Sequence, residues 1–395
     1  MHVCFVCNEY PRPGRQHGGI GRKIQVIARR FAAEGHRICV VGLYPRSDQW
    51  DDRGVTVSEL QHAAGFRGAR FVRNRAVVRR KLLELAAEQE LDLVEFQDGN
   101  SPLIPLNLGV PVVVRFSLSH SYFAHVLGRR PRFLQARLER FFLPRAEGFA
   151  SCSRYVAEIT AEVFGLDLES IRILPNPIDL SQWQPGDPAE VDQRLILFLG
   201  SIHWVKGADK LAQAFVMVQE EFPDSRLVFL GRDKSIPDRP GTSYSRYIAE
   251  RLPQSARAAV EFTGHQSATT VRSWLRRASV VALPSLAEGH SNAITEAQAT
   301  AKAIVLSRRG SAAEVIEDGV SGLLCDPLSP QDIAEKICRV LREPGFRDSL
   351  GLEARRTAED RFSIDVLYPE NLDFYESTVD RSKHRRARYH SVSIG

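Results

Sequence analysis

The sequence has few of the features that mark membrane, secreted or disulfide-stabilised proteins. It holds six cysteines among 395 residues, and its longest apolar runs are far shorter than the roughly 18 residues that cross a bilayer. Only two residues precede the first apolar run, so we expect no signal peptide and a cytoplasmic protein. With 43% apolar and 26% charged residues, the composition excludes disorder over most of the chain. The length indicates two or three domains.

The cysteines do not form a recognisable metal or redox site. Cys4 and Cys7 form a C-x-x-C pair, but they lie in an apolar run that predicts a buried strand. Residues three apart on a strand point to opposite faces, so the two sulfur atoms should diverge. No second cysteine pair or histidine pair completes a zinc site. We therefore expect buried structural cysteines and no bound metal.

Charge is distributed unevenly along the chain. Residues 1–170 hold 24 Lys/Arg and 18 Asp/Glu, whereas residues 171–380 hold 24 and 30. Residues 381–395 hold five Lys/Arg and no acid. Because this last segment is short, charged and terminal, we expect a basic, disordered tail.

The basic charge of the first half is concentrated in two clusters. Residues 67–85 predict a basic amphipathic helix, because Phe71, Val78, Leu82 and Leu85 form one helical stripe. The second cluster consists of Arg129, Arg130, Arg132, Arg137 and Arg140. Both are explained either by a solvated helix face or by contact with an anionic acceptor or an acidic membrane surface. Nucleic acid is not expected as a partner, since no aromatic residues are interleaved with the cations and no helix-turn-helix is present.

Two stretches of the chain alternate short apolar runs with helical patterns. In the first, strands are predicted at 3–6, 37–42, 92–96 and 110–114, with a helix at 23–34. In the second, strands are predicted at 195–199, 226–230, 260–262, 280–283 and 303–306, with helices at 209–221, 268–278, 293–300 and 330–341. Apolar runs without polar alternation predict parallel strands that are covered on both faces.

A proline-rich segment separates the two stretches. Four prolines fall between residues 175 and 188, and proline disfavours both helices and central strands. We therefore predict two doubly wound α/β domains, residues 1–174 and 191–363, joined by a hinge linker at 175–190. Open sheets of this kind bind ligands beyond the carboxyl ends of their strands.

Three segments at predicted strand ends are candidates for binding. Residues 18–21 (Gly-Gly-Ile-Gly) precede a helix, where free N–H groups suit phosphate, although a plain turn explains them equally well. Lys206 lies in a loop after a predicted strand. It is either a solvated surface lysine or a ligand for phosphate oxygens. Glu288 and Glu296 lie eight residues apart around a helix start, which is typical of a sugar-nucleotide site. They are also compatible with a simple interaction between an acid and the helix dipole.

Taken together, these motifs resemble those of the retaining glycosyltransferases of family 4, which have the GT-B fold. The residues that carry the resemblance are Gly18-Gly19, Pro175-Asn176 with Asp179, Lys206-Gly207, Glu288-x7-Glu296 with Ala297, Gly310 to Leu324, and Arg361-Phe362-Ser363. The resemblance extends from residue 1 to about residue 378. It implies two Rossmann-like domains that face each other across a cleft. The N-terminal domain would bind the acceptor and the C-terminal domain the donor, and a last helix at 364–380 would cross back to the first.

The resemblance also implies roles for individual residues. Lys206 would neutralise the donor pyrophosphate, Glu288 would bind hydroxyls of the donor sugar, and Glu296 would bind the ribose. The other donor-binding residues that it implies are Gly18, Gly19, Gly264, His265, Gly289, His290, Ser291 and Asn292.

Three positions depart from the family pattern. Ser201 stands where an arginine is usual, and Arg232 is a candidate to replace that cation. Ser117 stands where many members have a histidine near the sugar, and His120 is the nearest candidate for the same catalytic role. Ala301 stands where a glycine is usual, which we interpret as a local packing change.

The implied reaction is transfer of a sugar from a UDP-, GDP- or ADP-sugar to a hydroxyl acceptor, with retention of configuration, in glycan, polysaccharide or glycolipid biosynthesis. No two aspartates are separated by a single residue, so the D-x-D metal clamp is absent and we expect neither metal nor cofactor. The acceptor is expected to be anionic or lipid-linked, with the 67–85 helix against an acidic membrane. Two alternatives stay open: a nucleotide-sugar epimerase of the same architecture, and a non-catalytic binding paralogue.

Overall fold

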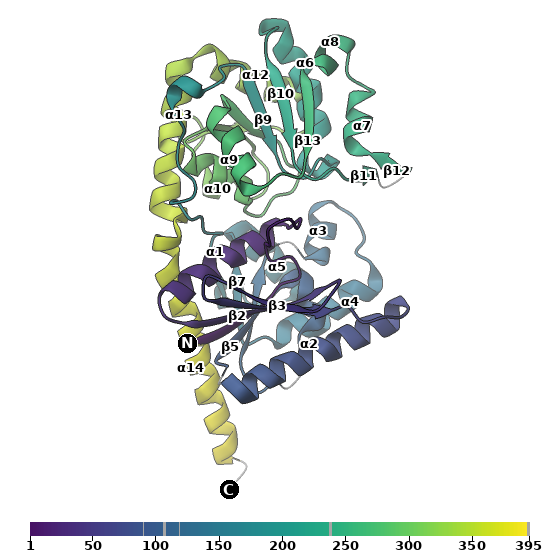
Figure 1. Cartoon of the computed structure of the whole chain (residues 1–395), viewed down its shortest axis with the longest axis vertical. Coiled ribbons are helices and arrows are strands. Elements are labelled where there is room, and N and C mark those ends of the chain that lie inside the picture. The colour runs from purple at the N-terminus through teal and green to yellow at the C-terminus, as the bar shows by residue number, and fades with distance from the viewer. Residues whose placement is uncertain (90, 106–107, 118, 237–238, 393–395) are drawn as a thin grey trace. The chain divides into compact units, whose positions relative to one another are not determined.

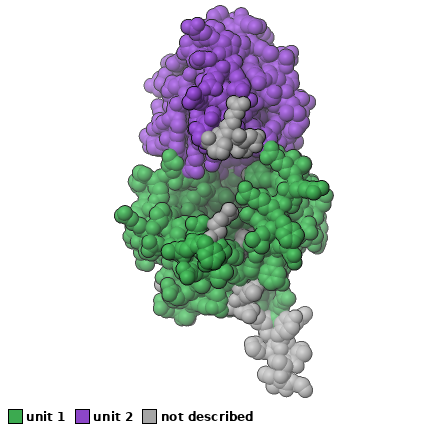
Figure 2. All heavy atoms as spheres, turned by 90° about the vertical axis from the view of Figure 1, so that its right-hand side faces the viewer, with its two compact units in different colours: residues 1–177, 364–395 green, residues 178–363 purple. Residues whose placement is uncertain are grey.

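The chain folds into two compact units, which the computed structural model describes for residues 1–89, 91–105, 108–117, 119–236 and 239–392 (Figure 1). Unit 1 consists of Met1–Pro177 and Ile364–Gly395, and unit 2 of Ile178–Ser363 (Figure 2). The first boundary lies within the proline-rich segment, and the second lies at the start of the final helix.

Unit 1 is built on an eight-stranded sheet in the order β3-β4-β2-β1-β5-β6-β7-β8. Its strands are β1 (His2–Val6), β2 (Arg37–Tyr44), β3 (Asp48–Asp52), β4 (Val55–Gln61), β5 (Leu93–Gln97), β6 (Val112–Phe116), β7 (Gly148–Ser151) and β8 (Ile171–Ile173). All neighbouring strands are parallel except β3 and β4.

The β3–β4 hairpin was not predicted from the sequence. Arg53 and Gly54 form its turn with φ angles of 56° and 86°, the left-handed conformation that two-residue hairpin turns require. Because β3 has the polar sequence Asp-Gln-Trp-Asp-Asp and lies at the edge of the sheet, it lacks the apolar pattern on which the strand predictions were based.

Helices cover both faces of this sheet. They are α1 (Gly19–Ala33), α2 (Arg67–Gln89), α3 (His120–Val126), α4 (Phe133–Phe142), α5 (Arg154–Phe164) and α14 (Ile364–Val392). Helices α1 and α14 pack on one face together with Cys7, and α2 and α5 pack on the other together with Cys4. The prediction that Cys4 and Cys7 are buried on opposite faces is therefore confirmed.

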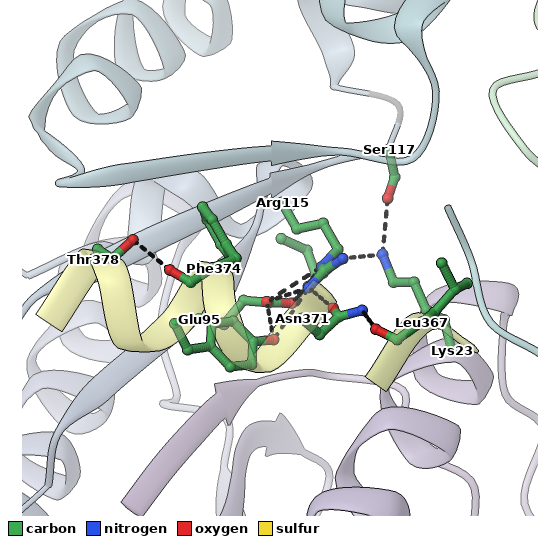
Figure 3. A network of polar contacts seen from close by, with 10 residues as sticks. Lys23, Glu95, Arg115, Ser117, Leu367, Asn371, Phe374 and Thr378 are labelled. Atoms are coloured by element: carbon green, nitrogen blue, oxygen red, sulfur yellow. Dashed lines mark hydrogen bonds and ion pairs between the residues drawn. The ribbon is translucent and has the colours of Figure 1, made fainter. Parts of the chain in front are cut away.

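A buried network of hydrogen bonds and an ion pair connects α14 to the sheet of unit 1 (Figure 3). Arg115 on β6 donates to Glu95 on β5 at 3.0 Å, and both side chains are completely buried. The same guanidinium donates to Asn371 Oδ1 at 2.7 Å and to Tyr375 Oη at 3.1 Å. Tyr375 in turn donates to Glu95 at 2.6 Å. Burial alone would raise the pKa of Glu95, but the adjacent Arg115 charge holds it below its usual range.

Helix α14 continues to Val392, whereas we expected a disordered tail from residue 381. Its anchored part includes Phe374, Tyr375 and Val379, which are buried. The residues that follow include lysine, alanine and several arginines, which are good helix formers. A helix that is already nucleated is extended by such residues at little cost.

Unit 2 contains a six-stranded, all-parallel sheet in the order β13-β10-β9-β14-β15-β16. Its strands are β9 (Leu195–Leu199), β10 (Arg226–Leu230), β13 (Val260–Gly264), β14 (Val280–Leu283), β15 (Ala303–Ser307) and β16 (Leu323–Cys325). A separate two-stranded sheet pairs β11 (Ser235–Ile236) with β12 (Arg239–Ser243). The helices are α6 (Ala208–Glu221), α7 (Tyr244–Ala249), α8 (Gln254–Ala258), α9 (Ala268–Arg277), α10 (Asn292–Ala299), α11 (Ala312–Val315), α12 (Pro330–Arg342) and α13 (Pro344–Thr357).

Part of the expected hinge belongs to the core of unit 2. Ile178 and Trp183 are buried there, and the Ile178 amide donates to the Phe362 carbonyl at 2.8 Å. Residues 178 to 183 are therefore packed as part of this unit.

Candidate active site

The predicted donor-binding residues of unit 2 all lie at one edge of its sheet, where parallel strands end. Lys206 is in the loop after β9, Arg232 follows β10, and Gly264 and His265 end or follow β13. Glu288 is in the loop after β14, which leads into α10. Hydrogen bonds join the first three loops, since Gly231 N donates to Gly264 O at 3.0 Å and Ile202 N to Arg232 O at 2.9 Å.

Two glycines bring neighbouring loops against the loop after β14: Gly207 lies in the loop after β9, and Gly310 lies in the loop after β15. Gly207 has a φ of 68°, and a Cβ atom there would lie 2.0 Å from the carbonyl oxygen of Pro284. Gly310 has a φ of 76°, and a Cβ atom there would lie 2.4 Å from the carbonyl oxygen of Glu288. Only glycine combines this left-handed conformation with so close a backbone approach. Lys206 and Glu288 are thus set opposite each other by the backbones on either side.

Lys206 and Glu288 form an ion pair at this edge. The carboxylate side chain is 11% exposed and the ammonium side chain 27%, so the pair is largely shielded but still open to solvent on the lysine side. Lys206 ends a turn that His203 caps by accepting the Val205 amide at 3.2 Å. Ser285 Oγ donates to Glu288 at 3.4 Å. This arrangement offers a cation and a hydrogen-bonding carboxylate at one point.

The start of α10 completes the unit 2 group. Ser291 caps the helix by accepting the Ala293 amide at 3.3 Å, and Asn292 is the first helical residue. The buried His290 ring packs edge-on against Phe362, with the ring centroids 4.8 Å apart. Glu296 is buried one turn into the helix. The structure thus pairs Lys206 with Glu288 and places the other predicted residues of unit 2 in loops at the same edge of the sheet or in the first turns of α10, while their individual roles stay predictions.

In unit 1 the Gly18-Gly19 motif does lie at a helix start, but a carboxylate already occupies it. Gly18 is the N-terminal cap of α1, and Gly21 N donates to Glu9 Oε1 at 3.2 Å. A Cβ atom on Gly18 would lie 2.3 Å from Glu9 Oε2. The glycine therefore makes room for Glu9, and a phosphate would have to displace that side chain to reach these amides.

His120 serves the local fold of unit 1. It is the first residue of α3, and its Nε2 accepts the Arg132 amide at 3.0 Å. The buried Glu139 accepts the amides of His120 and Ser121 at 3.1 and 3.0 Å. This ring nitrogen already has a backbone partner, which explains a histidine here without catalysis. Its catalytic role stays a prediction.

Comparison with known proteins identifies the family. A family model described as Glycosyl transferases group 1 matches residues 182–357, and one described as Glycosyltransferase Family 4 matches residues 17–182. The chain belongs to this glycosyltransferase family. The resemblance predicted from the sequence is confirmed.

The glycosyltransferase is similar to enzymes of several kinds. It is 30% identical over 250 residues to D-inositol 3-phosphate glycosyltransferase of Xylanimonas cellulosilytica, and this alignment covers 60% of the chain but only 58% of that relative. Sucrose-phosphate synthase from Thermosynechococcus elongatus has a TM-score of 0.78 at 18% identity, with 95% and 98% coverage. Anabaena Alr3699/HepE in complex with UDP-glucose has a TM-score of 0.76 at 15% identity, with 95% and 100% coverage. The predicted GT-B fold class is confirmed.

One departure of the glycosyltransferase from its family has a backbone explanation. Ala301, which stands where a glycine is usual, has a φ of 53°. The position requires the left-handed conformation, which costs alanine about 1 kcal/mol or more relative to glycine. The expected packing change is therefore a backbone requirement that alanine meets under strain.

A second departure, Ser117, belongs to a group of buried polar residues that was not predicted from the sequence. Ser117 Oγ accepts a hydrogen bond from Lys23 Nζ at 3.0 Å (Figure 3). Gln97 Oε1 accepts another from the same ammonium at 2.7 Å. Lys23 is buried, and burial together with the charge of Arg115 lowers its pKa to about 8. The only sequence signal was a lysine on the apolar face of α1, between Ile20 and Ile24.

Asp98, directly after β5, is the acid of this group. Its oxygens accept the amides of Ser117 at 3.0 Å and Gly99 at 2.8 Å, yet burial raises its pKa to about 6. The positive charge of Lys23 lowers the pKa of Asp98, and the negative charge of Glu139 raises it. A buried lysine and aspartate with pKa values displaced toward neutrality are typical of functional sites.

The raised pKa of Asp98 predicts a pH effect on stability. Between its ordinary pKa of 3.8 and the folded value of about 6, the folded state binds more protons than the unfolded state. The contribution of Asp98 to the free energy of unfolding is therefore fully present below pH 3.8. It is lost as the pH rises through about 6, which lowers the free energy of unfolding by about 2–3 kcal/mol. In urea unfolding at several pH values, Asp98→Asn should flatten this part of the profile. An unchanged profile would contradict the assignment.

None of the described helices combines the length and hydropathy needed to span a bilayer. Within the part of the chain that the structure describes, no three His, Cys, Asp or Glu side chains are grouped as metal ligands would be.

Proposed function

We propose that this glycosyltransferase moves a sugar from a nucleotide-sugar donor to a hydroxyl acceptor, with retention of configuration and without a metal ion. The observation that carries the proposal is the Lys206–Glu288 pair at the carboxyl edge of the unit 2 sheet. The similarity to a structure that contains UDP-glucose supports a nucleotide sugar, with UDP as the first nucleotide to test before GDP and ADP.

The chemistry follows from the charges at this edge. Departure of a nucleoside diphosphate leaves negative charge, which Lys206 and Arg232 would stabilise together with amides at the start of α10. Glu288 and Glu296 would accept hydrogen bonds from hydroxyls of the sugar and the ribose. Because Glu288 is paired with Lys206, we assign it to binding and not to nucleophilic attack. The acceptor would then attack from the face that the diphosphate leaves, and the diphosphate would take its proton.

For the acceptor, we propose an anionic compound. The net positive charge of residues 1–170 supports it, as does the similarity to an enzyme named for inositol 3-phosphate. A lipid-linked acceptor at the cytoplasmic face of a membrane belongs to the same proposal, in glycan, polysaccharide or glycolipid synthesis.

The test is incubation of the purified protein with each nucleotide sugar and a panel of phosphorylated acceptors, with and without EDTA. NMR of the product should show the anomeric configuration of the donor, and turnover should be unchanged by EDTA. An inverted product would overturn retention, and loss of activity restored by a divalent cation would overturn metal independence. An isomerised sugar formed without acceptor would instead indicate the epimerase. No affinity for any nucleotide sugar would leave the binding paralogue.

A further inference from the structure

Exposed apolar side chains are concentrated on one part of unit 1. Among the described residues, nine large apolar side chains are exposed, and five of them lie between residues 66 and 141. The most exposed are Phe66 at 80%, Phe133 at 74% and Leu134 at 70%. Single exposed apolar residues need no explanation, but a group of this size on one surface indicates an interaction site.

Helix α4 carries most of this group on its outward face. Only Glu139 and Phe142 of its ten residues are buried, so the helix contributes little to the core. The Arg137 guanidinium lies 5.3 Å from the centre of the Phe133 ring, and the Arg145 guanidinium lies 3.7 Å from that of Phe141. The two exposed aromatic rings of this segment, Phe133 and Phe141, are thus each paired with an arginine.

The exposed charge around α4 has one sign. Between residues 129 and 145 the only acid is Glu139, which is fully buried beneath α3. The exposed charged side chains of this segment are Arg129, Arg130, Arg132, Arg137, Arg140 and Arg145. A surface of cations and apolar groups without exposed acids favours an anionic partner with an apolar interior.

The first half of α2 extends this surface. The stripe that we predicted to be amphipathic faces inward, because Val78, Leu82 and Leu85 are buried in the core. The sides left exposed carry Val72 and the cations Arg70, Arg73, Arg79 and Arg80. Figure 1 shows α2 next to α4, and the Arg75 guanidinium joins them, lying 4.0 Å from the centre of the Phe142 ring.

We propose that this docking surface, formed by Phe66, Val72, Phe133, Leu134, Phe141 and the surrounding arginines, binds the surface of an acidic phospholipid bilayer. Phenylalanine and leucine tips enter the boundary between headgroups and acyl chains, while the arginines pair with lipid phosphates. Arginine suits this position because it can pair with a phosphate while its plane stays on an aromatic ring. This inference deepens the proposed function, which includes a lipid-linked acceptor at a membrane, but vesicle binding is measured without sugar transfer, so either proposal can fail while the other holds.

The test is co-sedimentation of the full chain with vesicles of phosphatidylcholine alone and of phosphatidylcholine mixed with phosphatidylglycerol. The wild type should bind the acidic vesicles at least tenfold more tightly, and added salt should weaken this binding. Phe133→Ser combined with Leu134→Ser should reduce binding about tenfold or more. Arg130→Gln combined with Arg140→Gln should also reduce it and flatten the salt dependence.

The matched control is Leu352→Ser, because Leu352 is 51% exposed on α13 of unit 2. It should bind vesicles as the wild type does, and thermal unfolding should show that all variants fold. Equal binding to both kinds of vesicle, or unchanged binding by the Phe133/Leu134 variant, would overturn the proposal. A dimer in light scattering that the same variant dissociates would overturn it in favour of a second copy of the chain. Tight binding to RNA with no binding to vesicles would overturn it in favour of a nucleic acid.

Discussion

Replacing Lys206 by alanine is expected to reduce the rate of sugar transfer by about 10²–10³-fold, the usual cost of removing one preorganised group that stabilises developing charge. The structure gives two reasons for a large effect. The ammonium lies at the carboxyl edge of the unit 2 sheet. The close approach of Gly207 to the Pro284 carbonyl holds the loop that carries it, and Glu288 pairs with it. The arginine that the family resemblance implies at position 201 is also replaced by serine, so the proposed second cation is Arg232, which lies on a different loop. Steady-state assays with a fixed acceptor measure the loss.

The same substitution leaves Glu288 without its cation, so stability must be measured beside activity. Glu288 is 11% exposed, and loss of its partner is expected to lower the free energy of unfolding by about 1–3 kcal/mol. Lys206→Ala combined with Glu288→Gln should recover much of that stability but none of the activity. Lys210→Ala, in the first turn of α6, is the matched control and should retain activity. Near-normal turnover by Lys206→Ala would refute the proposed role.

The exact ends of several strands in unit 2 could be predicted, because these strands are apolar on both faces. Strands β9, β10 and β14 begin and end at the predicted positions, because each is a short apolar run covered by helices on two sides. The β3–β4 hairpin was missed for the opposite reason. Its edge strand is polar, and its turn depends on the left-handed conformation of Arg53 and Gly54, which no apolar pattern reveals.

The candidate site was likewise predicted only in part. Lys206 and Glu288 lie in loops that follow predicted strands, so the sequence could place them at one edge of a sheet. The group formed by Lys23, Gln97, Asp98 and Ser117 could not be found in this way. Its members are up to 94 positions apart, and their contacts depend on the packing of α1 against β5 and β6. Glu9 at the start of α1 was missed because a side chain reaching back to a helix start leaves no periodic signal.

The buried pair of Arg115 and Glu95 should have the largest effect on stability. Arg115→Met leaves Glu95 inside the protein without its cation, which typically costs about 3–5 kcal/mol. The substitution also removes the hydrogen bonds from Arg115 to Asn371 and Tyr375, so α14 loses two hydrogen bonds to the sheet. Urea unfolding measures the loss, and limited proteolysis should cut α14 earlier than in the wild type.

Two further variants separate this electrostatic explanation from simple loss of packing. Arg115→Met combined with Glu95→Gln removes both charges, and it should recover at least half of the lost stability, because the remaining cost is that of altered hydrogen bonds. The exposed pair of Arg154 and Glu158 is the control, since its side chains are 60% and 50% exposed. Arg154→Met should change stability by less than about 1 kcal/mol. If Arg115→Met were as mild as Arg154→Met, the pair could not be what holds α14. Phe374 and Tyr375, buried on the same helix, would then hold it by their apolar contacts and by the hydrogen bond from Tyr375 to Glu95.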